Sequence, residues 1–330
     1  MKILIVGPGA MGCLFASLLI KSGFDVHILD KNPTRANHIR KNGIKTTGIS
    51  KIYIPPSKIK ITTDCKKIGP ADILIVFVKA QRTEEAIRKS LPCISKNTII
   101  LTLQNGLGNI ETIASALKKS QKKVNAVLAG ITSHGATLTG HGAVRHAGKG
   151  LTVIGDAVYT GSKLHAKIGP SVYTDANPHP EPPALIKNIF NGAGIKTKTT
   201  KNIKNVLWSK LVINSAINPI GSITLRTNGE IIKNSCLKDI LCMTAEESAG
   251  VAKKSGIKLL YKNPSKKVLQ VCKSTAKNYN SMLQDILHRK KTEIESINGA
   301  VIKQAEKTGL DTPLNKMLYC FVKLMEEHCV

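Results

Sequence analysis

The sequence predicts an α/β domain with a doubly wound, mainly parallel sheet, followed by an all-α domain. From residue 1 to about 200, short β-branched apolar runs alternate with helical stretches, as in a parallel sheet with crossover helices. Beyond Thr200 the strand signal disappears, and apolar residues recur with the 3.6-residue period of helices. The length of 330 residues exceeds what one hydrophobic core usually serves. We place the boundary in a polar stretch, which gives domains of residues 1–199 and 200–330.

The apolar runs of the first domain predict five strands, at residues 2–6, 26–29, 73–78, 98–103 and 124–131. The stretches between them predict helices at residues 11–22, 32–42, 83–91 and 108–118. Residues 144–172 have the pattern of a β-meander. The segment 174–183 contains four prolines, which predicts a loop before a helix at 184–191.

Composition narrows the function classes. The net charge of +28 can mark a nucleic-acid binder, but the lysines are spread over the whole chain, aromatic residues make up only 4%, and no nucleic-acid motif stands out. We therefore expect no nucleic-acid partner, although the charge keeps that alternative open. No apolar run is long enough to span a membrane. The eight cysteines form no C-x-x-C pair or Cys/His cluster, which favours a cytoplasmic protein with reduced thiols and no metal site.

A glycine-rich motif follows the first strand, and its six residues are Gly7, Pro8, Gly9, Ala10, Met11 and Gly12. It fits G-x-G-x-x-G between a strand and an apolar helix, the context that makes this pattern informative. Gly7 permits a tight turn, Gly9 lets the backbone approach a pyrophosphate, and Gly12 allows close packing of helix on strand. The helix N-terminus adds N–H groups and a positive dipole. A glycine turn that binds nothing is the alternative, but the context predicts a dinucleotide-binding Rossmann domain.

The end of the second predicted strand bears on the choice between NAD and NADP. Asp30 lies about 20 residues after the glycines, where a carboxylate can hydrogen-bond the ribose hydroxyls of NAD. Lys31 and Arg35 could instead neutralise the 2′-phosphate of NADP. Spacing alone leaves the two cofactors open.

Two more polar residues follow predicted strands of the same sheet. Lys79 comes after the third strand, and Asn105 lies in the segment Gln-Asn-Gly after the fourth. Ligands of parallel sheets collect at the carboxyl ends of the strands, so both residues are candidates to contact the ribose, nicotinamide and substrate. The alternatives are a solvated lysine and an ordinary Asn-Gly turn.

In the second domain, Lys210, Asn214 and Asn218 are spaced i, i+4 and i+8 and therefore share one face of a predicted helix. The residues between them are mostly apolar, so the helix is expected to be buried, and its polar stripe must meet partners or line a cavity. Burial lowers the pKa of a lysine, which suits a proton donor near neutral pH. The alternative is a structural stripe whose amides bond to backbone and whose lysine reaches solvent.

Four motifs are spread over both predicted domains. They are GPGAMG at 7–12, Gln-Asn-Gly at 104–106, Leu-Trp-Ser-Lys-Leu…Asn…Asn-Pro at 207–219, and the pair SMLQDI at 281–286 with TEIESING at 292–299. Together, and in this order, they specifically resemble the ketopantoate reductase (2-dehydropantoate 2-reductase) family. This resemblance implies a helical second domain of the 6-phosphogluconate-dehydrogenase-like type and the reduction of 2-dehydropantoate to pantoate, in the route to pantothenate and coenzyme A.

The resemblance also implies roles for single residues. Lys210 matches the family's general acid, Glu293 its acidic partner, and Asn214, Asn218 and Ser281 its substrate contacts. Asn105 and Lys79 match residues near the nicotinamide and its ribose, with Asn105 also expected to contact substrate. NADP(H) is implied as the preferred cofactor, whereas Asp30, which departs from the commoner basic residue, leaves NAD(H) open.

Other functions remain as alternatives. One is a related two-domain dehydrogenase that acts on another 2-keto acid or on a 3-hydroxy acid. Another is a dinucleotide sensor or nucleic-acid-binding protein without catalytic activity. We expect the protein to bind a small-molecule substrate and no membrane. The sequence leaves open whether it forms a homodimer.

Overall fold

The computed structural model describes residues 1–157 and 181–329. These residues form two compact units. The first contains Met1–Gln104 and Asn109–Ile203, and the second contains Asn105–Gly108 and Lys204–Val330. The segment 105–108, at the end of a strand of the first unit, thus belongs to the helical unit. The boundary predicted after residue 199 falls at the end of the last strand, β12 (Thr197–Thr199).

The first unit contains an eight-stranded sheet with the order β12-β11-β8-β7-β6-β1-β2-β5. Among the described strands, every neighbouring pair of this sheet is parallel except β8 with β11. The predicted α/β fold with a mainly parallel sheet is therefore confirmed. In chain order the first seven strands are β1 (Lys2–Val6), β2 (Asp25–Leu29), β5 (Lys60–Thr62), β6 (Ile73–Val76), β7 (Ile99–Thr102), β8 (Ala126–Thr132) and β11 (Thr152–Asp156).

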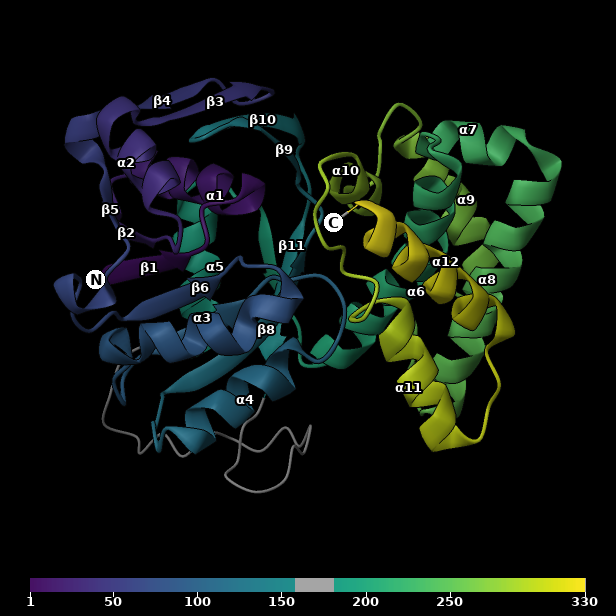
Figure 1. The fold of residues 1–330 in the computed structure, drawn as a ribbon. Coiled ribbons are helices and arrows are strands. Elements are labelled where there is room, and N and C mark those ends of the chain that lie inside the picture. The colour runs from purple at the N-terminus through teal and green to yellow at the C-terminus, as the bar shows by residue number, and fades with distance from the viewer. Residues whose placement is uncertain (158–180, 330) are drawn as a thin grey trace. The chain divides into compact units, whose positions relative to one another are not determined.

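Helices cover both faces of this sheet (Figure 1). Because side chains of a strand alternate between faces, Ile3 and Ile5 pack with α1 (Ala10–Lys21) and α5 (Pro182–Gly192). Leu4 and Val6 pack instead with α3 (Thr83–Ser90) and α4 (Asn109–Lys119). The near-continuous apolar strands are thus explained by burial on both sides. A further helix, α2 (Pro33–Asn42), follows β2.

A second sheet, which the sequence did not predict, lies against α1. It has four strands in the order β4-β3-β10-β9. Its strands are β3 (Ile44–Gly48), β4 (Ile52–Ile54), β9 (Gly135–Gly140) and β10 (Ala143–Gly148). The meander predicted over 144–172 is wrong in its described part, since β10 belongs to this sheet whereas β11 joins the main one. Residues 158–172 of that prediction, and 174–180 of the predicted loop, lie outside the described residues.

The second unit is helical, as predicted. Its helices are α6 (Ile203–Thr224), α7 (Asn228–Lys233), α8 (Ser235–Lys254), α9 (Pro264–Ser274), α10 (Ser281–Leu287), α11 (Asn298–Thr308) and α12 (Pro313–Cys329). Helix α6 contributes to two apolar clusters. Val212 and Ile217 pack in one with residues of α7, α8 and α9, and Trp208 and Leu211 pack in the other with residues of α8, α11 and α12. This central position explains why α6 is apolar on most sides.

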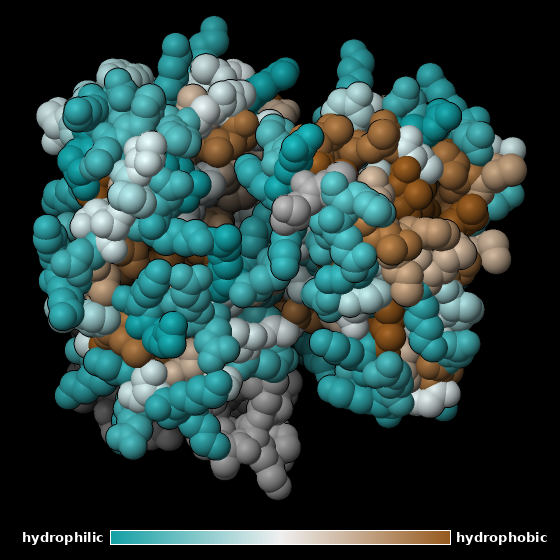
Figure 2. All heavy atoms as spheres, viewed as in Figure 1, coloured by the Kyte–Doolittle hydropathy of each residue, from teal (hydrophilic) through white to brown (hydrophobic). Residues whose placement is uncertain are grey.

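The surface reflects the composition. Hydrophilic residues cover much of the visible face of the first unit, whereas hydrophobic residues gather on part of the helical unit (Figure 2). Large exposed apolar side chains of α12 include Met317, Phe321 and Leu324. In the described part of the chain, no helix combines the length and apolarity needed to cross a membrane.

Candidate active site

The glycine motif forms a tight turn between β1 and α1. Gly7 has a φ of +96°, and a Cβ there would lie 2.8 Å from Cγ1 of Val78. A Cβ on Gly12 would lie 2.2 Å from the carbonyl oxygen of Gly7, so only glycine allows the helix to approach the strand this closely. Gly9, the N-cap of α1, differs because a Cβ there would meet nothing within 4 Å. The open space beside Gly9 and the first-turn N–H groups of α1 fit the pyrophosphate of a dinucleotide.

Asp30 follows β2 and is already engaged in an ion pair. Its carboxylate is 1% exposed and accepts hydrogen bonds from Nε and Nη2 of Arg35, both at 2.6 Å. It also accepts the backbone N–H of Asn32 at 3.0 Å. The hydrogen bond to Asp30 raises the pKa of Arg35 above its usual range. Lys31 is exposed beside this pair. Asp30 and Arg35 thus form a neutralised pair, and the carboxylate of Asp30 is not isolated.

Lys79 and Gln104 lie just beyond the carboxyl ends of β6 and β7. Lys79 is half-buried and precedes a short 3-10 turn at Ala80–Arg82. Gln104 is buried, and its side-chain amide donates to the carbonyl of Val78 at 2.7 Å and to the hydroxyl of Thr83 at 2.8 Å. Gln104 belongs to the Gln-Asn-Gly motif, but the sequence alone predicted no role for it. The structure shows that it ties the two strand ends together where the chain leaves the first unit.

The second unit joins three of the predicted residues directly. Nζ of Lys210, on α6, donates to Oδ1 of Asn105 at 2.8 Å. The amide nitrogen of the same Asn105 donates to Oε2 of Glu293 at 3.3 Å. Glu293, in the turn before α11, is only 7% exposed, and Lys210 is half-buried. Any two of these three residues are separated by more than 80 positions in the sequence. Their side chains nevertheless form one hydrogen-bonded series of an ammonium, an amide and a carboxylate group.

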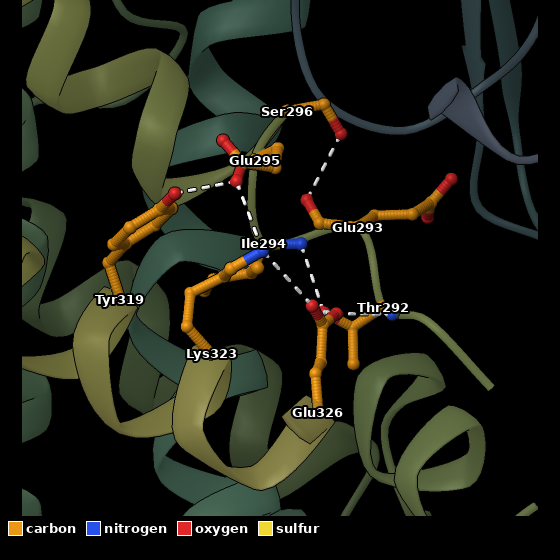
Figure 3. Close-up of polar contacts among 8 residues, drawn as sticks. All are labelled: Thr292, Glu293, Ile294, Glu295, Ser296, Tyr319, Lys323 and Glu326. Atoms are coloured by element: carbon orange, nitrogen blue, oxygen red, sulfur yellow. Dashed lines mark hydrogen bonds and ion pairs between the residues drawn. The ribbon is translucent and has the colours of Figure 1, made fainter. Parts of the chain in front are cut away.

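The position of Asn105 is set by its neighbours in the segment 105–108. The N–H of Leu107 donates to the carbonyl of Ser296 at 2.8 Å. Gly106 has a φ of +80°, and a Cβ there would lie 2.3 Å from that same carbonyl oxygen. The hydroxyl of Ser296 donates to the carbonyl of Glu293 at 3.0 Å (Figure 3). Glycine at position 106 is therefore required by close contact with the turn that carries Glu293.

A proline within α6 helps to place this turn. Pro219 lacks an N–H and cannot donate to the carbonyl of Ser215, four residues earlier. The side-chain amide of Asn298 donates to that carbonyl instead, at 2.9 Å. Because Asn298 begins α11, this hydrogen bond connects the Glu293 turn to the helix that carries Lys210.

The remaining predicted substrate residues lie along the same helix or beside it. Asn214 is half-buried and Asn218 is 5% exposed, both on the face of α6 that carries Lys210. Ser281 is exposed at the start of α10. Its neighbour Asn280 donates from its amide to the carbonyl of Ile217 at 3.4 Å, which places the start of α10 next to the Asn218 turn.

The surroundings of Lys210 change its acidity. Desolvation lowers the pKa of the ammonium group from 10.5 to about 8, although the charge of Glu293 opposes this effect. A lysine with this pKa is charged at neutral pH and still gives up its proton readily. No group of three or more His, Cys, Asp or Glu side chains that could hold a metal ion occurs among the described residues. The side chains of Lys210, Asn105 and Glu293 offer proton donation and hydrogen bonding.

The α/β unit carries a glycine turn of the dinucleotide-binding type, and the helical unit carries a lysine of lowered pKa and a carboxylate. Together these features define the class of the protein as a two-unit NAD(P)-dependent oxidoreductase. Comparison with known proteins agrees with this class. Residues 3–158 match the family model "Ketopantoate reductase PanE/ApbA", and residues 202–326 match its C-terminal counterpart. The chain belongs to the ketopantoate reductase family, and the resemblance seen in the sequence is confirmed.

Individual relatives cover nearly the whole chain. A 2-dehydropantoate 2-reductase of Pyrococcus horikoshii is 36% identical over 99% of this chain and 98% of its own length. The crystal structure of a PanE/ApbA family ketopantoate reductase from Ralstonia eutropha has a TM-score of 0.83 at 26% identity, covering 99% of each chain. D-mandelate dehydrogenase, solved with NADH and anilino(oxo)acetate, also has a TM-score of 0.83, at 25% identity over 100% of this chain and 99% of its own.

Proposed function

We propose that this enzyme reduces the ketone of 2-dehydropantoate to the alcohol of pantoate, in the route to pantothenate and coenzyme A, with NADPH as the preferred hydride donor. The hydrogen-bonded chain from Lys210 through Asn105 to Glu293 carries the proposal. It combines a proton donor with groups that can bind a polar 2-keto acid. The name and full-length similarity of the Pyrococcus relative support this choice of substrate.

Each group of the site has a role in this reaction. The glycine turn and the N-terminus of α1 hold the pyrophosphate, and the bound nicotinamide supplies the hydride. As negative charge develops on the ketone oxygen, the ammonium of Lys210 stabilises it and delivers the proton. Asn105 and Glu293 orient that ammonium, and Glu293 can also accept a hydrogen bond from the substrate hydroxyl. Asn214, Asn218 and Ser281 can bind the substrate carboxylate and hydroxyl without adding charge.

A substrate comparison tests the proposal. We expect 2-dehydropantoate to be reduced with a kcat/KM at least about 10-fold above that for phenylglyoxylate, the keto acid corresponding to mandelate. A tenfold ratio requires only about 1.4 kcal/mol of differential transition-state binding. The rate is followed as NADPH oxidation at physiological ionic strength. Faster reduction of phenylglyoxylate would instead favour a related 2-keto acid dehydrogenase, and no turnover of either acid would favour a dinucleotide sensor.

The preference for NADPH is tested at Asp30. We expect Asp30→Ala to raise the ratio of kcat/KM for NADPH to that for NADH by about 10-fold, because charge-assisted hydrogen bonds contribute about 1.5–3 kcal/mol. The substitution removes a carboxylate that disfavours a 2′-phosphate, and it releases the guanidinium of Arg35 to bind one. The ratio is measured with saturating 2-dehydropantoate.

Two further variants serve as controls for Asp30. Asp30→Asn keeps the shape and an acceptor for the N–H of Asn32 while removing the charge. Asp25→Ala removes a carboxylate at the other end of β2, where it pairs with Lys60 at 2.8 Å, and should leave the ratio unchanged. A shift of the Asp30 variants toward NADH, or a wild-type enzyme that uses NADH better, would reverse the proposed preference.

We also propose a cytoplasmic location. The cysteines whose side chains the structure describes are free thiols, which suits a reducing compartment. The homodimer left open by the sequence stays a prediction.

A further inference from the structure

We propose that Glu326, on the last helix α12, is a positioning residue that holds Glu293 at the correct distance from Asn105 and Lys210. This inference rests on the role proposed above for Glu293. It gives the C-terminal helix, for which the sequence predicted no functional residue, a role in positioning Glu293.

Glu326 accepts hydrogen bonds from Thr292, the residue immediately before Glu293. Its side chain is 7% exposed, and Oε1 accepts the backbone N–H of Thr292 at 2.6 Å and the hydroxyl of Thr292 at 2.7 Å (Figure 3). The same hydroxyl oxygen accepts the N–H of Ile294 at 3.1 Å. One carboxylate oxygen therefore fixes the residue before Glu293 and, through a hydroxyl, the residue after it.

A second attachment from α12 holds the same turn at Glu295. The hydroxyl of Tyr319 donates to Oε1 of Glu295 at 2.5 Å, and Nζ of Lys323 lies 3.3 Å from that oxygen. Lys323 also lies 3.4 Å from Oε2 of Glu326 and so connects the two carboxylates. Residues 319, 323 and 326 share one face of α12 because of their i, i+4 and i+7 spacing. Partial burial tends to raise the pKa of Glu295, but the hydrogen bonds from Tyr319 and Lys323 lower it overall.

The turn directs its side chains to opposite sides. Figure 3 shows Glu295 directed toward Tyr319 and Lys323, whereas the side chain of Glu293 extends away from α12. On that far side, Glu293 accepts from Asn105 at 3.3 Å, and Asn105 accepts from Lys210 at 2.8 Å. A shift of the turn toward or away from α12 would therefore change the separation between the carboxylate of Glu293 and the amide of Asn105.

The chemistry of Glu326 favours positioning over simple packing. A buried carboxylate is costly unless it is paired and hydrogen-bonded, and an apolar side chain in its place would remove the acceptor of both donors of Thr292. The hydrogen bonds of Glu326 are concentrated on the backbone and hydroxyl of Thr292, next to the proposed catalytic carboxylate. Displacing catalytic groups by about 1 Å can lower a rate by about 10²-fold. Hydrogen bonds that fix the turn beside Glu293 should therefore affect the reaction rate.

The first test compares three variants of α12. Glu326→Ala should lower kcat/KM for 2-dehydropantoate by about 10-fold or more, with the KM for NADPH unchanged. Glu326→Gln keeps an oxygen that accepts both donors of Thr292 and should stay within about 3-fold of wild type. Glu327→Ala, at the exposed neighbouring position, should match wild type. Thermal melting confirms that each variant is folded. A folded Glu326→Ala enzyme with wild-type kcat/KM would overturn the proposal.

The second test asks whether Glu326 acts through Glu293. In a Glu293→Gln background, Glu326→Ala should cost clearly less than in the wild type, because the group being positioned is already altered. The alkaline limb of the pH–rate profile should move to lower pH in Glu326→Ala as it does in Glu293→Gln, since both weaken the support that Glu293 gives the Lys210 proton. Equal losses in both backgrounds, or an unmoved alkaline limb, would show a structural role and overturn the inference.

Two outcomes separate this inference from the proposed function itself. If Glu293→Gln has wild-type activity, the role of Glu293 fails and the inference fails with it. If Glu293→Gln is impaired but Glu326→Ala is not, only the positioning role fails. Should Glu326→Ala not fold, Thr292→Val replaces it, because it deletes the hydroxyl that Glu326 holds. Thr292→Ser keeps that hydroxyl and should restore activity, and equal activity of the two Thr292 variants would overturn the proposal.

Discussion

Lys210→Ala should lower kcat for reduction of 2-dehydropantoate by at least about 10²-fold, with little change in the dissociation constant of NADPH. General acid catalysis contributes about 10²–10⁴-fold, and stabilisation of a developing oxyanion can add about 10²-fold. Lys210 is in the helical unit, whereas the glycine turn that fits the pyrophosphate is in the other unit. The loss should therefore appear in the chemical step, measured by single-turnover kinetics, and not in cofactor affinity, measured by calorimetry.

The pH dependence gives an independent check on Lys210. Burial lowers its pKa to about 8, so the reaction, which needs the protonated form, should slow as pH rises above about 8. An unperturbed lysine would hold its proton to about pH 10.4. Lys210→Met, which keeps much of the apolar stem without the charge, should show the same loss of rate and no alkaline limb from this group. Wild-type turnover in Lys210→Ala, with the same alkaline limb, would mean that α6 serves only for packing.

The parts of the fold that the sequence predicts best are those with a strong local cause. Glycines at 7, 9 and 12 between an apolar strand and an apolar helix allow few structures, and Gly7 and Gly12 turn out to be fixed by contacts of 2.8 Å and 2.2 Å that a Cβ would make. The five predicted strands of the main sheet are likewise mostly apolar runs, because helices bury both of their faces.

The second sheet was not predicted because its strands lack that signal. The sequence of β9, Gly-Ala-Thr-Leu-Thr-Gly, has glycine at both ends, and its residues are half-buried or exposed. The sequence of β3, Ile-Lys-Thr-Thr-Gly, has only one large apolar residue. Such strands are stabilised by their neighbours, and the parallel pairing of β3 with β10 joins residues about 100 positions apart.

In the candidate site too, features set by local sequence could be predicted, whereas contacts between residues far apart in the sequence could not. Helical periodicity predicted that Lys210, Asn214 and Asn218 share a face, because that is a property of one helix. Periodicity could not predict that Asn105 would leave the strand unit and lie between Lys210 and Glu293. Glu326 has no local signal at all, since a glutamate near the end of an amphipathic helix reads as a solvated charge until its contact with Thr292 is seen.

Gly9→Asp should abolish cofactor binding while leaving the fold intact. A Cβ at position 9 meets nothing within 4 Å, and the φ of −75° is accessible to aspartate. Asp is also a favourable N-cap residue, so it should accept first-turn N–H groups of α1 and stabilise the helix slightly. Those are the groups that would hold the pyrophosphate. The new carboxylate therefore competes with the cofactor for its donors and repels its charge.

The expected loss of affinity in Gly9→Asp is large. Two unit charges 4 Å apart near a protein surface repel by about 4 kcal/mol, which corresponds to about 10³-fold in a dissociation constant. Calorimetry with NADPH and NADH measures the loss, and thermal melting should show an unchanged or slightly raised Tm. Gly250→Asp adds the same charge at an exposed, open position of α8 and should bind both cofactors normally. Gly12→Ala should instead lower the Tm, because its Cβ would collide with the carbonyl of Gly7. Unchanged affinity in folded Gly9→Asp would place the pyrophosphate away from α1.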